Sequence, residues 1–138
     1  MFYTTIKLSS LQQMCKGSMV DHLGIIFTEI GESHLSAKMP VDSRTHQPFG
    51  MLHGGASVAL AETLGSVAAN LTIDQQKYYC VGLEINANHV KSVRDGWVYG
   101  TTTPLYIGTK TQIWEIRISN VEQELICISR LTLAVLEK

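Results

Sequence analysis

GGASVALAETLGSVAANL, residues 54–71, carries the strongest fold signal in the chain, and it directly follows the run RTHQPFGMLH at residues 44–53. The stretch is long enough for about five helical turns, and its alanines and leucines favour a helix. A helix that is apolar nearly all round is expected inside a protein, with other elements on every side. We therefore predict a buried central helix over residues 54–71.

Glu62 is the only charged residue in that stretch. An apolar environment disfavours the charged form of a carboxylate unless hydrogen bonds or a cleft offset the cost. Ser66 follows one turn later on the same face, and Gly54 and Gly55 leave N–H groups unpaired at the helix start. A carboxylate, a hydroxyl that can orient water and backbone donors for an oxyanion are the parts of an acyl-transfer site. The alternative is a structural carboxylate that pairs with a buried basic group or reaches a subunit interface.

Length and composition bound the function classes. The 138 residues suit a single domain, and 45% hydrophobic with 17% charged residues indicates a globular protein whose low charge suggests self-association. A net charge of −1 gives no support for nucleic-acid binding. Glu62, Thr63 and Ser66 interrupt the longest apolar run, and the first residues lack a secretory signal pattern, so we expect no membrane association and a cytoplasmic location.

Neither the cysteines nor the histidines show metal-binding spacing, so no metal site is expected. The three cysteines are widely separated and also give no disulfide framework: Cys15, Cys80 and Cys127. Three of the histidines stand apart from one another and carry no supporting context: His22, His34 and His46.

The residues around the helix predict strands. A short helix over residues 9–15 and a hairpin of strands over 24–30 and 34–39 precede it, and strands over 81–89, 97–107, around 114–118 and 125–136 follow it. Pro104 predicts a bend or bulge in the second of these. In residues 81–89 a period of two predicts that one face carries Val81, Leu83, Ile85, Ala87 and His89, opposite Glu84, Asn86 and Asn88.

This order of elements indicates an α+β fold in which an antiparallel sheet wraps around one long central helix. One helix cannot cover both faces of such a sheet. The polar side of the Glu84 strand, or the edge of the sheet, is therefore expected to meet another subunit.

Two segments carry a resemblance to a known family. They are QPFGMLHGGASVALAETLGS, residues 47–66, and GLEINANHV, residues 82–90. The chain resembles the hotdog-fold acyl-CoA thioesterases from about Met19 to Leu136. More narrowly, it is similar to the 4-hydroxybenzoyl-CoA branch, which includes the 1,4-dihydroxy-2-naphthoyl-CoA hydrolase of menaquinone synthesis and the proofreading thioesterase of enterobactin synthesis. The resemblance implies a hotdog fold and hydrolysis of an acyl-CoA.

The resemblance also implies roles for five residues. Glu62 is the catalytic carboxylate, acting as a nucleophile or as a general base. The Gly54 amide polarises the thioester oxygen, Gln47 and His53 position the acyl carbonyl, and Ser66 holds the attacking water. A structural alternative for His53 is a loop histidine that caps the helix. The family's site forms between two subunits, which implies a homodimer at least and a dimer of dimers as the expected assembly.

Coenzyme A enters as part of the substrate, and no separate cofactor is expected. The resemblance places it near the end of the strand that leads into residues 89–92 and at the hairpin of residues 106–111. Lys91, Arg94 and Lys110 have the charge to meet phosphates, with ordinary surface lysines and arginines as the alternative, and His89 has the alternative of a partly buried histidine. The expected contacts are Gly82, His89, Val90, Lys91, Ser92, Arg94, Tyr106, Ile107, Gly108, Thr109, Lys110 and Thr111.

The acyl group stays open between aromatic groups, of the 1,4-dihydroxy-2-naphthoyl or benzoyl type, and medium-length chains. Candidate walls of its pocket are Met51, Leu52, Val67, Ala68 and Tyr78. Two rival functions are a non-catalytic acyl-CoA-binding module, in which Glu62 is structural, and a proofreading hydrolase of an acylated carrier protein. A binding module has no need for a carboxylate in the path of the thioester.

Overall fold

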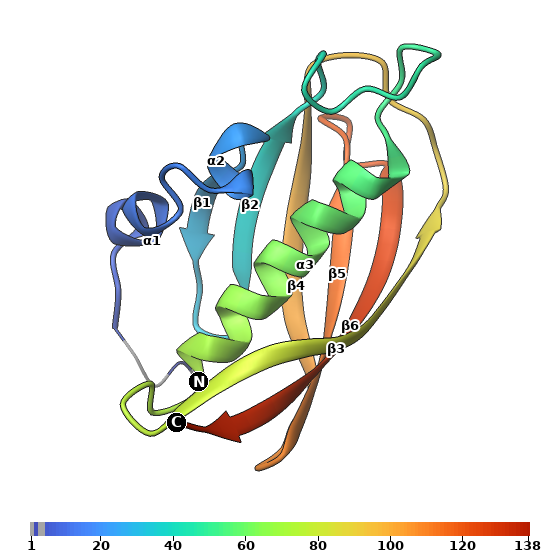
Figure 1. The fold of residues 1–138 in the computed structure, drawn as a ribbon. Coiled ribbons are helices and arrows are strands. Elements are labelled where there is room, and N and C mark those ends of the chain that lie inside the picture. The colour runs from blue at the N-terminus through green and yellow to red at the C-terminus, as the bar shows by residue number, and fades with distance from the viewer. Residues whose placement is uncertain (1, 3–4) are drawn as a thin grey trace.

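The computed structural model describes residue 2 and residues 5–138, which form a six-stranded antiparallel sheet wrapped around one long helix (Figure 1). The strand order is β1-β2-β4-β5-β6-β3, so the chain leaves β2, crosses the sheet through α3 and resumes at the opposite edge. The elements are α1 (Leu8–Met14), α2 (Met19–His22), β1 (Ile26–Ile30), β2 (Leu35–Pro40), α3 (Gly54–Leu71), β3 (Tyr78–His89), β4 (Trp97–Ile107), β5 (Thr111–Ser119) and β6 (Leu125–Glu137). The predicted α+β arrangement is confirmed.

Helix α3 spans the predicted residues 54–71 and lies diagonally across one face of the sheet (Figure 1). Leu60, Leu64 and Ala68 are completely buried against the strands. The opposite face of the helix, which carries Glu62 and Ser66, is only half-buried. The prediction that α3 is enclosed on every side is therefore wrong for a single chain, because one sheet covers only one face of a helix. No helix in the described part of the chain has the length and apolar character needed to cross a membrane.

Strand β3 begins at Tyr78 and contains a β-bulge that the sequence pattern does not reveal. Gly82 pairs with Leu133 and Glu84 pairs with Thr132, so Leu83 is an extra residue without a partner of its own. The bulge reverses the alternation, because each residue after it points to the side opposite from the one expected.

The predicted common face of residues 81–89 is therefore wrong. Val81 and Leu83 are 38% and 61% exposed, whereas Ile85 and Ala87 pack against the core. Before the bulge it is Cys80 that is buried. The predicted irregularity at Pro104 is confirmed, since the pairing of β4 with β5 shifts between Pro104 and Tyr106.

A buried hydrogen-bonded chain joins the sheet to the end of α3. The Trp114 indole donates to Gln112 Oε1 at 2.8 Å, and Gln112 Nε2 donates to the hydroxyl of Thr72, the C-cap residue that follows α3, also at 2.8 Å. Trp114 and Gln112 are both fully buried. A buried polar group without a hydrogen-bond partner destabilises the fold, and these two bonds avoid that cost. The chain holds the helix in one position along β5.

Candidate active site

His53 caps the start of α3. Its Nδ1 atom accepts a hydrogen bond of 2.7 Å from the Gly55 amide. The capping role considered for this residue is therefore present. Because Nδ1 is the acceptor, the neutral ring carries its proton on Nε2, which makes Nε2 a hydrogen-bond donor. Capping thus selects the tautomer that a carbonyl-binding histidine needs.

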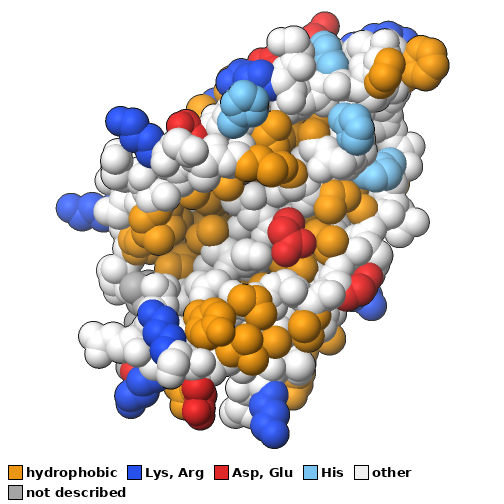
Figure 2. All heavy atoms as spheres, in the orientation of Figure 1, with side chains coloured by type: hydrophobic (Ala, Val, Ile, Leu, Met, Phe, Trp, Pro, Cys, Tyr) orange, Lys and Arg blue, Asp and Glu red, His pale blue; other side chains and the backbone are white. Residues whose placement is uncertain are grey.

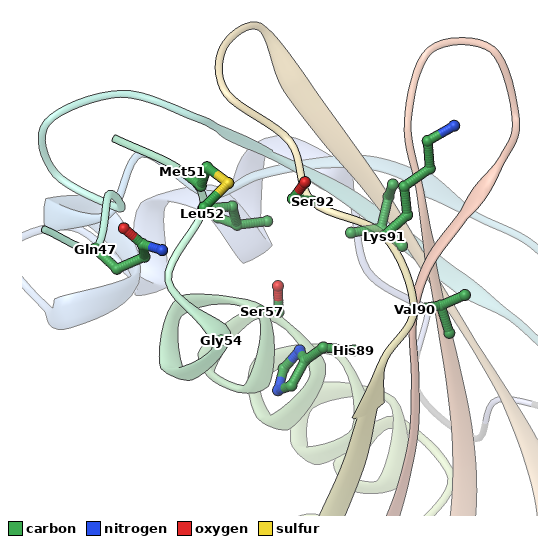
Figure 3. A pocket seen from close by; sticks show the side chains of 10 residues that line it. Gln47, Met51, Leu52, Gly54, Ser57, His89, Val90, Lys91 and Ser92 are labelled. Atoms are coloured by element: carbon green, nitrogen blue, oxygen red, sulfur yellow. The ribbon is translucent and has the colours of Figure 1, made fainter. Parts of the chain in front are cut away.

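A cavity of about 340 Å³ lies between the start of α3 and the end of β3 (Figure 3). Its lining residues are Gln47, Met51, Leu52, Gly54, Ser57, His89, Val90, Lys91, Ser92 and Ile126. The His89 ring lies so close to Gly54 that a Cβ atom there would be 2.8 Å from His89 Nε2. A side chain at position 54 would therefore push the His89 ring from this place, and the glycine backbone borders the cavity.

Gln47 stands at the mouth of this cavity in a turn that the backbone closes. The Gln47 amide donates to Met51 O at 2.7 Å, and the Gly50 amide donates to Gln47 O at 3.0 Å. The side-chain oxygen of Gln47 accepts a hydrogen bond from the Phe49 amide. This leaves the Gln47 Nε2 group to donate, as a residue that binds a carbonyl oxygen requires.

Ser57 is a lining residue that the sequence reasoning missed. It is 1% exposed and borders the cavity from the first turn of α3 (Figure 3). Its position three residues after Gly54, on the same side of the helix, is the signal that could have found it. A serine within an alanine-rich helix does not otherwise stand out.

Glu62 lies in the middle of α3 on the half-buried face. Burial raises the pKa of its carboxyl group, and a hydrogen bond from Ser66 lowers the pKa in part. The carboxylate also lies directly over Gly82 of β3, where a Cβ atom would collide with Glu62 Oε1. No basic side chain contributes to the pKa shift, so the structural alternative of a buried ion pair finds no support.

Within one chain, the structure does not bring all five predicted catalytic residues together. Glu62 and Ser66 are in contact, and Gln47, His53 and Gly54 gather around the opening of α3. Glu62 lies eight positions after Gly54, or roughly 12 Å along the helix axis. One chain therefore carries two separate halves of the predicted site.

Comparison with known proteins places the chain in a family. A profile of the thioesterase superfamily matches residues 49–127. The chain belongs to that superfamily. This thioesterase is 55% identical to the 1,4-dihydroxy-2-naphthoyl-CoA hydrolase of Escherichia coli K12, over 95% of this chain and 96% of that protein. It is 50% identical to the proofreading thioesterase EntH of Cronobacter sakazakii, over 94% of this chain and 93% of that protein.

Solved structures agree with this assignment. A crystal structure of a mutant thioesterase from Pseudomonas aeruginosa superposes on the thioesterase with a TM-score of 0.98 at 48% identity, and the match covers 99% of each chain. The expected hotdog fold is thereby confirmed, as is the expected enzyme class, a thioester hydrolase.

The expected coenzyme A contacts of the thioesterase lie at opposite ends of the sheet. His89, Val90, Lys91 and Ser92 border the cavity at the opening of α3. Lys91 also forms an ion pair with Glu124. A second cavity, of about 800 Å³, borders Gly108, Thr109 and Lys110 together with Tyr78. Outside these two cavities lie Gly82, Arg94, Tyr106, Ile107 and Thr111.

The candidate walls of the acyl pocket are also dispersed. Met51 and Leu52 border the first cavity, and Tyr78 borders the second. Val67 borders a third cavity, of about 320 Å³, between α1 and α3. Ala68 is fully buried in the core, so its expected place in a pocket wall is wrong. Ala68 lies four residues after Leu64 and so shares its side of α3, which faces the sheet. The amino-acid composition of the helix alone does not tell this side from the opposite one.

The described residues, 2 and 5–138, contain no group of three or more His, Cys, Asp and Glu side chains that could hold a metal ion. All three cysteines are free thiols. Burial raises the pKa of Cys80 to about 11. Cys80 is therefore a thiol at neutral pH, which fits a small core residue and not a nucleophile.

Proposed function

We propose that this thioesterase hydrolyses acyl-CoA to the free acid and coenzyme A, with Glu62 as its catalytic carboxylate. The observation that carries the proposal is a half-buried carboxylate whose pKa is raised by burial and whose one hydrogen-bond partner in that shift is a hydroxyl, Ser66. A carboxylate without a cationic partner is poised to accept a proton or to attack a carbonyl carbon. The name of the Escherichia coli relative supports a coenzyme A thioester as the substrate.

The complete site requires a second copy of the chain. The roughly 12 Å between Gly54 and Glu62 exceeds the span of a single thioester group, whose reacting atoms approach to about 3–3.5 Å. Strand β3 offers the pairing edge, because among the described residues it pairs with β6 alone. We infer a homodimer in which β3 of each copy meets, so that Glu62 of one copy faces the Gln47, His53 and Gly54 segment of the other. A dimer of dimers is the proposed assembly in solution.

The two half-sites supply complementary chemistry. The Gly54 amide and the Nε2–H of His53 donate to the carbonyl oxygen, which becomes negative as the tetrahedral intermediate forms. In the general-base route, Glu62 takes a proton from the water held by Ser66 as the water oxygen bonds to the carbonyl carbon. The C–S bond then breaks, and the proton passes from Glu62 to the departing thiolate of coenzyme A. In the nucleophilic route, a Glu62 oxygen bonds to the carbonyl carbon and the C–S bond breaks, which releases the coenzyme A thiolate and leaves a mixed anhydride. Water then hydrolyses the anhydride to the free acid and the Glu62 carboxylate, and the proton that is released passes to the thiolate.

Antiparallel pairing of two β3 strands also accounts for the dispersed coenzyme A contacts. In such a pair, the end of one β3, at His89, lies beside the start of the other, at Tyr78. The segment 89–92 of one copy then approaches the hairpin 108–110 of the second copy. We propose that coenzyme A lies between them and that no further cofactor takes part.

The cavity between α1 and α3 is the proposed site for the acyl group. Ser66 borders this cavity as well as the Glu62 carboxylate, so the cavity begins next to the reacting group. The remaining lining is mainly apolar and includes Leu11, Met14 and Val67. Its volume of about 320 Å³ suits a single aromatic group or a medium-length chain. The free cysteines agree with a reducing compartment, and we propose the cytoplasm.

Release of coenzyme A thiol from a panel of thioesters tests the proposal. The panel contains 1,4-dihydroxy-2-naphthoyl-CoA, benzoyl-CoA, medium-chain acyl-CoAs and an acylated carrier protein. Glu62→Gln is expected to lower kcat by about 100- to 10,000-fold. Glu122→Gln, which neutralises an exposed carboxylate in the turn between β5 and β6, away from β3, is the matched control. Tight binding of acyl-CoA without turnover by the unmodified chain would establish the binding-module alternative, and turnover of the carrier-protein thioester alone would establish the proofreading alternative.

A further inference from the structure

Gly82 is the point at which β3 contacts the carboxylate of Glu62. A Cβ atom built on Gly82 would collide with Glu62 Oε1, and it would lie 3.5 Å from Glu62 Cδ and 3.7 Å from Leu131 Cδ1. The contacts with Cδ and with Leu131 are ordinary van der Waals distances. The carboxylate oxygen alone therefore occupies the volume that a side chain at position 82 would take.

The bulge at Leu83 makes this arrangement compatible with the other half-site. Gly82 and His89 are seven residues apart, so in a regular strand they would point to opposite faces. The extra residue in β3 restores them to the same face, toward α3. As a result Gly82 lies under Glu62, while His89 lies beside Gly54.

We propose that Gly82, together with the bulge at Leu83, is a positioning element for the carboxylate of Glu62. Because Gly82 has no side chain, the carboxylate oxygen of Glu62 can occupy the position from which it reaches the thioester. This inference rests on the proposed role of Glu62 and replaces the expectation that Gly82 contacts coenzyme A.

The nature of the contact separates this role from a structural one. The group that a Cβ atom would meet is the far end of a flexible side chain, which can rotate away without moving the backbone. A methyl group at position 82 is also favourable for a strand, where glycine is a poor residue. Gly82→Ala is therefore expected to fold and to dimerise normally while its carboxylate is displaced.

The experiment measures kcat, KM, thermal unfolding and the pH profile of kcat/KM for the unmodified dimer, Gly82→Ala and Glu62→Gln. Displacement of a reacting group by about 1 Å can cost on the order of 100-fold, so kcat of Gly82→Ala is expected to fall by about tenfold or more with KM and Tm unchanged. The acid limb of its pH profile is expected to move to lower pH, because a displaced carboxylate is better hydrated and more easily ionised.

A shorter carboxylate gives a second test. In a Glu62→Asp background the carboxylate is withdrawn from the space over Gly82, so adding Gly82→Ala is expected to change kcat by less than about twofold. A kcat of Gly82→Ala within about twofold of the unmodified enzyme, or loss of its fold or dimer, would overturn the inference. Equal activity of Glu62→Gln and the unmodified enzyme would instead overturn the proposed function, so the two failures are distinguishable.

Discussion

The two edge strands of the sheet, β1 and β3, differ in length, in regularity and in how far their outer backbone groups are protected. Strand β1 has five residues and an irregular pairing between Phe27 and Glu29. The side chain of Gln12, from α1, bonds to the backbone beside this edge: its Nε2 donates to Ile25 O and its Oε1 accepts from the Phe27 amide, both at 3.0 Å. An edge that is short, irregular and bonded to a side chain is protected against pairing with another chain.

The β3 edge is long, and its first half is apolar. It has twelve residues, and Tyr79, Val81 and Leu83 are 38–61% exposed along it. Apolar side chains gather over the face of the molecule that carries α3 and β3, with an acidic side chain among them (Figure 2). Edges of this kind are templates for strand pairing. The chain therefore protects one edge by itself and leaves the other open, and this open edge, next to Glu62, is the one on which we propose that a second copy pairs.

The largest effect on assembly and turnover is expected when charge is placed on the open edge, β3. Val81→Lys combined with Leu83→Lys is expected to produce monomers, because four lysines would face one another across the paired strands. Turnover is expected to fall by about 100-fold or more, since each Glu62 loses the oxyanion donors of the second copy. Light scattering and coenzyme A release measure the two effects.

A matched control for the lysine pair is Val121→Lys, which charges an apolar residue that is 69% exposed in the turn between β5 and β6. This variant is expected to remain a fully active dimer. A monomeric lysine-pair variant with normal turnover would show that one chain carries the whole site.

The closed edge is expected to respond in stability and not in activity. Gln12→Ala removes both backbone bonds at β1 and leaves a partly buried amide and carbonyl without that partner. We expect the free energy of unfolding to fall by about 1–3 kcal/mol, measured by urea denaturation. Gln13→Ala, at the exposed neighbouring position, is the control. A large loss of dimer in Gln12→Ala would contradict the separate roles of the two edges.

The smallest expected effect concerns the carboxylate beside the open edge. The Ser66 hydrogen bond lowers the pKa of Glu62 against the larger effect of burial, so Ser66→Ala is expected to raise that pKa further. In the proposed mechanism the ionised carboxylate is the active form, so the acid limb of kcat/KM is expected to move to higher pH. Thr63→Ala removes a hydroxyl that donates instead to Ala59 O at 2.7 Å, and its limb is expected to stay in place. If the acid limb of kcat/KM does not move in Ser66→Ala, the Ser66 hydroxyl does not bond to Glu62 in the reacting enzyme.

Much of the helical half of the fold could be predicted because its signals are local. The bounds of α3, the spacing of Glu62 and Ser66 and the glycines at the helix start all follow from neighbours within a few residues. The bulge at Leu83 could not be predicted, because a bulge depends on how β3 pairs with β6, more than forty residues away. The four-residue helix α2 was also missed, since so short a turn depends on its surroundings more than on propensity.

The family, the central helix and Glu62 as the candidate carboxylate could all be inferred from the amino-acid sequence, because residue types at fixed helical spacing place groups on one face whatever surrounds them. The positions of the site residues relative to one another depend on the tertiary structure. It placed Glu62 over Gly82, His89 beside Gly54 and the two half-sites roughly 12 Å apart. These relations depend on strand register and on the close packing of a helix against a sheet, which join residues distant in the chain and leave no periodic trace in the sequence.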